Sequence, residues 1–244
     1  MSPTHTFSSS ASIQPVIEAL RGELRTTFDQ SIVAHDIAHL DRVVCNAAQI
    51  CDTEPDADRF VVAIAALLHD FHRVLEKQHR RHVTPEEAEP ELRRWIAAST
   101  LVPASAIDRI CAAVNFTEYY RCAGHDIESM APSLEARIVR DADMLDALGA
   151  VGIARAFMFG GYLGEPMWVD TDPSSLGGTF VPGKATSVVH HFHEKLFRLE
   201  SEMLTHRGKV LARARTEYMR SFLDTLMEDL RPPRTRRRPG PADR

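Results

Sequence analysis

The sequence predicts an all-α fold, a helical bundle that ends in long C-terminal helices. Apolar residues recur with the 3.6-residue helical period in most of the segments between residues 12 and 230. No segment shows the sustained apolar–polar alternation of a β-strand. The chain has 244 residues and is 44% hydrophobic, so it is long enough to enclose one large core.

Three helices are predicted in the first third of the chain from the spacing of apolar residues. Ile13–Phe28 carries a 3.6-residue apolar stripe, and Leu40–Cys51 continues the same pattern. Val61–Leu68 is an unbroken apolar run, which predicts a buried helix. This run is too short and too rich in alanine to cross a membrane.

Two further helices are predicted in the middle of the chain. Thr84, followed by Pro85 and Glu87, forms a capping-box start for a helix that runs to about Ala98. The next helix is predicted over Ser105–Phe116 from its apolar spacing.

The C-terminal part of the sequence contains long helical patterns separated by a glycine-rich segment. Ser133–Phe159 is predicted to be helical and to break near Gly149 or Gly152. Residues 160–183 are rich in Gly, Pro and Asp and are predicted to form a long loop, a type of segment that often serves as a functional lid. Two long helices are predicted to complete the fold, at Ala185–His206 and Lys209–Leu230.

The ends of the chain differ in composition from the helical region. Residues 1–11 are polar and Ser-rich, and we expect a disordered N-terminal tail. Residues 231–244 are rich in Arg and Pro without an apolar period, and we expect a basic disordered tail. The predicted domain therefore spans residues 12–230.

Composition excludes several classes of protein. The net charge of −5 argues against a nucleic-acid binder, which usually has a strongly basic domain. The four cysteines form no CxxC pair, so a thiolate zinc site is not expected. We expect buried thiols in a reducing compartment. Without a signal-peptide pattern or an apolar stretch of about 18 residues, the sequence predicts a cytoplasmic protein that does not span a membrane.

The pair His69-Asp70 is the strongest functional signal in the sequence, because it closes the apolar run of the predicted buried helix. An imidazole and a carboxylate at such a position need partners, and a divalent metal satisfies both. His39 and Asp143 are candidate further ligands. Two imidazoles and two carboxylates suit Mn, Mg, Co, Ni, Fe or Zn, with positions left open for water and a substrate oxygen.

The order His39, then LLHD ending in His69-Asp70, then DAD ending in Asp143 resembles the H…HD…D signature of HD-domain metal-dependent phosphohydrolases. The segments AHDIAHLDRV, AALLHD, RIVRDADMLDALGAVGIARAF and HHFHEKLFRL are similar to those of a bacterial subfamily of stand-alone HD hydrolases. This resemblance covers residues 15–230. It implies an HD-domain helical bundle, and it implies that these four residues bind one divalent metal ion, with manganese expected first.

Two of the implied ligands have neighbours that could replace them. His35 lies one helical turn before His39, and Asp141 lies two residues before Asp143. We prefer His39 because the family's first ligand stands just ahead of an Arg-Val pair, and Asp143 because the last ligand is usually the Asp of an Ala-Asp pair. Asp141 and Asp146 are then expected to support or cap the site.

Basic and imidazole side chains near the expected metal are candidates for binding the substrate and moving protons. The candidate substrate-binding residues are Arg42, Lys77, Lys184 and His190, with Arg155 as a further cation. Arg42 could instead form a salt bridge with Asp36 or Asp70. The candidate catalytic residues are Asp70, which could accept the proton of a water molecule, and His72 and Arg73, which are expected where a helix end meets solvent.

The expected function is hydrolysis of a phosphate ester or anhydride by metal-activated water. The substrate class implied by the resemblance is a nucleotide, cleaved by a pyrophosphohydrolase or a phosphatase. Two alternatives are a degenerate HD module that binds a nucleotide signal and a di-iron oxygenase of the same superfamily. The oxygenase needs two more histidines, and AAVNFTEYY has Asn115 and no His where one usually lies. The long C-terminal helices could pair with a second chain.

Overall fold

The structure of the chain is a computed structural model that describes residues 7, 13–25, 28, 35–120, 124–170 and 186–230. Helices make up most of these residues, and no β-strand occurs among them, which confirms the all-α prediction. The helices, in chain order, are α1 (Ile13–Leu24), α2 (Ile37–Cys51), α3 (Arg59–Leu68), α4 (Phe71–His79), α5 (Pro85–Ser99), α6 (Ala104–Asn115), α7 (Ile127–Met130), α8 (Leu134–Asp146), α9 (Gly149–Leu163), α10 (Val188–Glu194), η3 (Leu196–Arg198), α11 (Leu199–Glu202) and α12 (His206–Asp229).

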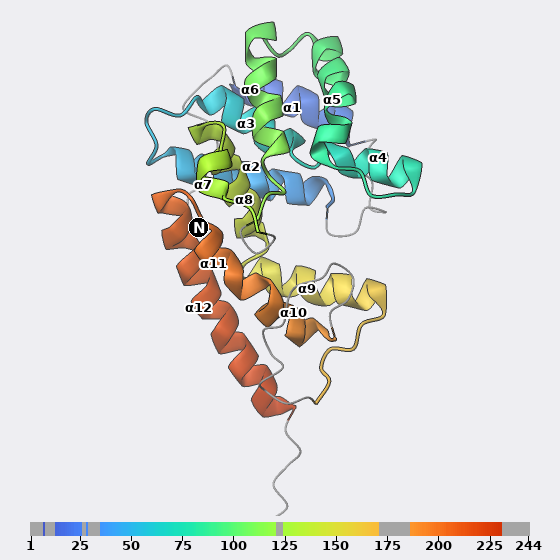
Figure 1. Cartoon of the computed structure of the whole chain (residues 1–244), viewed down its shortest axis with the longest axis vertical. Helices are drawn as coiled ribbons and strands as arrows, with labels where there is room; N and C mark the ends of the chain where they lie inside the picture. Colours follow the sequence, from blue (N-terminus) through green and yellow to red (C-terminus); the bar gives the residue numbers. More distant parts are fainter. Residues whose placement is uncertain are drawn as a thin grey trace, which may run out of the picture.

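The helices form two groups along the long axis of the molecule (Figure 1). One group contains α1 to α8, and the other contains α9 to α12. The long helix α12 joins the groups, because it packs against α8 and α2 as well as against α9.

Helix α3 lies at the centre of the first group, where it packs against α1, α2, α6 and α8. Every residue of Val61–Leu68 is buried, which confirms the predicted buried helix. His69 is the C-cap of α3, and Asp70 is the N-cap of α4. The His-Asp pair is therefore the corner between two consecutive helices.

Caps explain where several helices begin. Asp36 accepts a hydrogen bond from the backbone N–H of His39 at 2.9 Å, so α2 starts at Ile37, one turn before the predicted start. Thr84 accepts a hydrogen bond from the N–H of Glu87, which confirms the predicted start of α5.

The predicted break between residues 133 and 159 is confirmed, and two glycines explain it. Helices α8 and α9 meet at an angle of 66°. Gly149 has a φ of +72°, which L side chains rarely adopt, and a Cβ at Gly152 would lie 2.2 Å from the carbonyl oxygen of Ala147. Among the described residues no single helix is long and apolar enough to cross a membrane; α8 and α9 meet that criterion only as a bent pair.

Two predicted helices end at different residues in the structure. Helix α1 ends at Leu24 instead of Phe28. Helix α9 extends to Leu163, into the segment predicted as a loop, while residues 171–185 lie outside the described residues.

The prediction of one long helix over residues 185–206 is wrong. Lys195 (φ −127°, ψ −59°) interrupts the helical geometry after α10, and Met203 is extended (φ −64°, ψ 136°) after α11. Asp141 accepts hydrogen bonds from the backbone N–H groups of Leu204 and Thr205, which holds this segment against α8. Only α12 is a long C-terminal helix in the described part of the chain.

Phe7 is the one described residue of the predicted N-terminal tail. It is 1% exposed, and the guanidinium of Arg59 lies 5.5 Å from the centre of its ring. The other residues of that tail and residues 231–244 lie outside the described residues.

Three cysteines are described, and each is a free thiol. Cys51 and Cys111 are buried, and burial raises the pKa of these thiols to about 12 and about 11. Cys45 is partly buried, and Cys122 lies outside the described residues.

Candidate metal centre

The four predicted ligands lie together where α2, α8 and the α3–α4 corner meet. The Nε2 atoms of His39 and His69 are 3.1 Å apart, and they lie 3.2 and 3.3 Å from Oδ2 of Asp70. Both Nε2 atoms lie 3.5 Å from Oδ1 of Asp143. Two ligand atoms that each lie about 2.1 Å from the same ion are roughly 3.0–3.4 Å from each other, so the spacing of these residues fits a divalent metal.

The tautomers of the two histidines follow from the hydrogen bonds of their other ring nitrogens. Nδ1 of His39 lies 2.7 Å from Asp146 Oδ2, and Nδ1 of His69 lies 2.9 Å from the carbonyl oxygen of Ala66. Because these oxygens only accept hydrogen bonds, both Nδ1 atoms carry the proton. In its neutral form each imidazole would therefore direct the Nε2 lone pair at the carboxylates, which is the form that binds a metal.

The charges of the centre shift pKa values in opposite directions for its two kinds of group. Burial lowers the pKa of His69, but the charges of Asp70 and Asp143 outweigh it and raise that pKa well above its ordinary value. Burial raises the pKa of Asp143, but the hydrogen bond from His69 outweighs it and lowers it to about 2. Both shifts indicate that, without a metal, a proton on His69 supplies the positive charge that the two carboxylates favour, and a bound cation would take its place.

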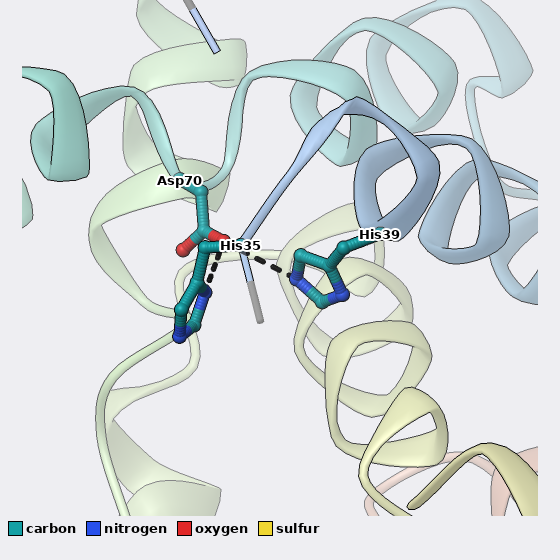
Figure 2. Close-up of side chains that lie close together, drawn as sticks. All are labelled: His35, His39 and Asp70. Atoms are coloured by element: carbon teal, nitrogen blue, oxygen red, sulfur yellow. Dashed lines mark hydrogen bonds and ion pairs between the residues drawn. The ribbon is translucent and has the colours of Figure 1, made fainter. Parts of the chain in front are cut away.

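Asp70 is turned away from the helix that it begins. It is the N-cap of α4, yet its side chain makes no capping hydrogen bond. Its Oδ2 instead lies 2.7 Å from Nδ1 of His35 and 3.2 Å from His39. Figure 2 shows the Asp70 carboxylate with His35 on one side and His39 on the other.

Asp146 supports His39 from behind the centre, in the supporting position that the sequence predicts. It accepts hydrogen bonds from Arg42 at 2.7 and 3.0 Å and from Arg155 at 3.0 Å. The alternative salt bridge of Arg42 to Asp36 or Asp70 is therefore wrong. Arg42 binds Asp146 instead, which lies 104 positions later in the chain.

His72 and Arg73 lie in the first turn of α4 and meet at Glu118. Arg73 forms ion pairs with Glu118 and with Glu76, and Nε2 of His72 lies 3.2 Å from Glu118 Oε1. His72 is only 1% exposed, so the expectation that it meets solvent is wrong. The sequence did not single out Glu118, since no pattern links it to α4.

The remaining predicted residues lie in different surroundings. Lys77 is exposed on α4, and Lys184 lies outside the described residues. His190 is buried, with Nδ1 2.7 Å from Ser187 Oγ and its ring stacked on Trp168 at 5.3 Å. Asn115, at the position considered for a second iron, donates to Glu89.

Two groups of described residues have the spacing of a metal site, and they share His39. The first consists of His39, His69 and Asp143, and the second of His35, His39 and Asp70. In each group the potential ligand atoms lie within 4.8 Å of one another.

Comparison with known proteins agrees with this arrangement. The HD domain family profile matches residues 36–148, a segment that contains all four predicted ligands. The uncharacterized protein YpgQ of Bacillus subtilis is 32% identical over 218 residues, which cover 87% of this chain and 95% of YpgQ.

Solved structures show the same fold. The crystal structure of B. subtilis YpgQ in complex with ADP has a TM-score of 0.66 and 29% identity, covering 90% of this chain and 97% of YpgQ. An HD-superfamily hydrolase from Bacillus thuringiensis has a TM-score of 0.61 and 29% identity, covering 89% of this chain and 95% of that protein. The chain belongs to the HD domain family, and its fold is that of the HD-superfamily hydrolases.

Proposed function

We propose that the chain is a metal-dependent phosphohydrolase in which His39, His69, Asp70 and Asp143 hold one divalent ion. The observation that carries the proposal is the convergence of four potential ligand atoms, 3.1 to 3.5 Å apart in the measured pairs. A bound ion would supply a Lewis acid that lowers the pKa of water and polarises a phosphoryl group. Manganese is the first ion to test, because a mixed nitrogen and oxygen donor set accepts it.

A nucleotide is the proposed substrate class. Support comes from YpgQ, which was crystallised with ADP and aligns with 90% of this chain. Helix α4 offers cations beside the centre: Nε of Arg73 lies 3.7 Å from Asp70 Oδ1, and Lys77 is exposed one turn later. We propose that these two side chains contact the phosphates, with Lys184 and His190 as further contacts of the substrate.

His72 and Asp70 are the proposed proton-transfer groups. His72 is oriented by Glu118, and its buried Nδ1 has no hydrogen-bond partner among the described residues. An oriented imidazole with one free nitrogen suits proton exchange with a leaving group. Asp70 would accept the proton of the attacking water. Arg42, bound to Asp146, orients His39 rather than the phosphate.

The test uses the full chain loaded with Mn, Mg, Co or Ni and a panel of nucleoside mono-, di- and triphosphates, with phosphate and pyrophosphate both assayed. We expect turnover of at least one nucleotide, and loss of that turnover in His69→Ala and Asp70→Ala at unchanged helix content. The matched control is His79→Ala, an exposed histidine at the end of α4. A chain that binds a nucleotide and converts none with any of these ions would be the non-catalytic module instead.

A further inference from the structure

We propose that His35 is a positioning residue that holds Oδ2 of Asp70 toward the metal from the outer side of the centre. The proposal rests on the metal centre proposed above. It gives a role to a histidine that belongs to the second spaced group and that the four-ligand centre does not use.

The carboxylate of Asp70 needs a hydrogen-bond donor to keep its orientation. It is only 5% exposed, and it accepts no capping hydrogen bond from the backbone of α4. When a metal is bound, the Nε2 atoms of His39 and His69 would bind the metal in place of a proton and could not donate to Asp70. Arg73 approaches only the other oxygen, at 3.7 Å. His35 is the described donor at hydrogen-bond distance, with Nδ1 2.7 Å from Oδ2.

The start of α2 places His35 for this contact. Asp36 caps the helix by accepting from the N–H of His39, so His35 stands directly before the cap and His39 stands in the first turn. The two rings are 5.3 Å apart and nearly perpendicular. One helix start therefore supplies both a proposed ligand and the residue that supports the neighbouring ligand, Asp70 (Figure 2).

The geometry favours a supporting role over ligation. Nδ1 of His35 is already engaged with Asp70, and the other nitrogen of the ring points away from that carboxylate (Figure 2). An ion bound between His35 and His39 would also need the Nε2 of His39, which faces His69 at 3.1 Å. Residues that hydrogen-bond to ligating groups orient them and tune metal affinity, typically by a factor of 10 to 100.

The test is calorimetric titration of the metal-free full chain with MnCl₂, comparing His35→Ala, His35→Asn and the control His79→Ala. The amide nitrogen of Asn can occupy the position of Nδ1 and donate to Asp70. We expect His35→Ala to weaken Mn²⁺ binding about 10- to 100-fold at one ion per chain, and we expect His35→Asn to recover affinity to within a few-fold. His79→Ala should bind like the wild type.

Absorption of the Co²⁺-loaded chains provides a second readout, since an unchanged ligand set should leave the visible spectrum of His35→Ala unchanged. Equal affinities of His35→Ala and wild type would overturn the supporting role. So would equal losses in the Ala and Asn variants together with an altered Co²⁺ spectrum, which would make His35 a ligand. A wild-type chain that binds no divalent ion would refute the proposed centre itself, and the role of His35 with it.

Discussion

Helix α8 carries two buried polar clusters that differ in their balance of donors and acceptors. Toward α2 and the α3–α4 corner it presents Asp143 and Asp146 to the candidate metal centre. Toward α11 and α12 it presents Arg140 and Asp141 to a second cluster, the α8–α12 tie, which consists of Arg140, Asp141, Glu202, Leu204 and Thr205.

The α8–α12 tie is balanced within the protein. Arg140, which is 0% exposed, donates to the carbonyls of Tyr119 and Glu202 and to Glu202 Oε2 at 2.7 to 2.8 Å. Asp141 accepts from two backbone N–H groups and from the hydroxyl of Thr205. The metal centre instead brings two carboxylates against two imidazole rings whose Nε2 atoms could bind a metal. The difference is the one expected if the tie holds the fold together and the centre binds the proposed metal.

The largest expected effect comes from breaking the tie. Arg140→Leu removes the buried ion pair between Arg140 and Glu202, and we expect a loss of about 3–5 kcal/mol in the free energy of unfolding. Urea denaturation of the metal-free chain measures it. The control is Arg213→Leu, which removes an exposed pair with Glu217 on α12 and should change stability little. Equal effects of the two variants would contradict the distinction.

The next effect comes from the metal centre and depends on the ion. Mn²⁺ at 100 times its dissociation constant should stabilise the wild type by about 2.7 kcal/mol. Asp143→Asn should lose this gain, and its metal-free stability should fall, because the lowered pKa of Asp143 means that its charge stabilises the fold at neutral pH. Thermal unfolding with MnCl₂ and with EDTA tests both statements. A variant that keeps the full Mn²⁺ response would remove Asp143 from the ligand set.

A smaller effect is expected at the start of α12. Thr205 caps this helix by accepting from the N–H of Gly208 at 3.0 Å, and its hydroxyl donates to Asp141 at 2.7 Å. Thr205→Ala should cost about 1–2 kcal/mol of stability. Thr205→Ser keeps both hydrogen bonds and should stay near the wild type, so urea denaturation of the pair isolates the hydroxyl. Equal losses would show that the methyl group, and not the hydroxyl, matters.

The smallest expected effect is a difference in pH dependence between two carboxyls of α8. Burial raises the pKa of Asp146, but hydrogen bonds from His39 and Arg42 outweigh it and lower that pKa, whereas burial raises the pKa of Asp141. A lowered pKa stabilises the fold above the unfolded value of about 3.9, and this stabilisation is lost as the pH falls below it. A raised carboxyl pKa has the opposite effect: it lowers the stability of the fold at higher pH, and this loss is relieved as the pH falls.

Stability of the metal-free chain between pH 6 and 3 tests this difference. Asp146→Asn should flatten the decline toward acid, because it removes a group that stays charged in the fold while the unfolded chain takes up its proton. Asp141→Asn should steepen the decline or leave it unchanged. The opposite ranking of the two slopes would mean that the directions of the two pKa shifts are wrong.

The fold and the four converging residues could be predicted because their signals are local. Caps such as Thr84, the apolar run of α3 and the order of His and Asp residues are all visible within short windows of sequence. Glu118 and the pairing of Arg42 with Asp146 could not be predicted, because each depends on residues 45 or more positions apart. The break before α12 was missed for the same reason, since Asp141 causes it from a distant helix.

The corner formed by His69 and Asp70 has a mechanical consequence. No linker separates α3 from α4, because one residue ends the first helix and the next residue begins the second. Any displacement of α4, whose exposed side carries Lys77, would therefore also displace the carboxylate of Asp70 relative to the two imidazoles.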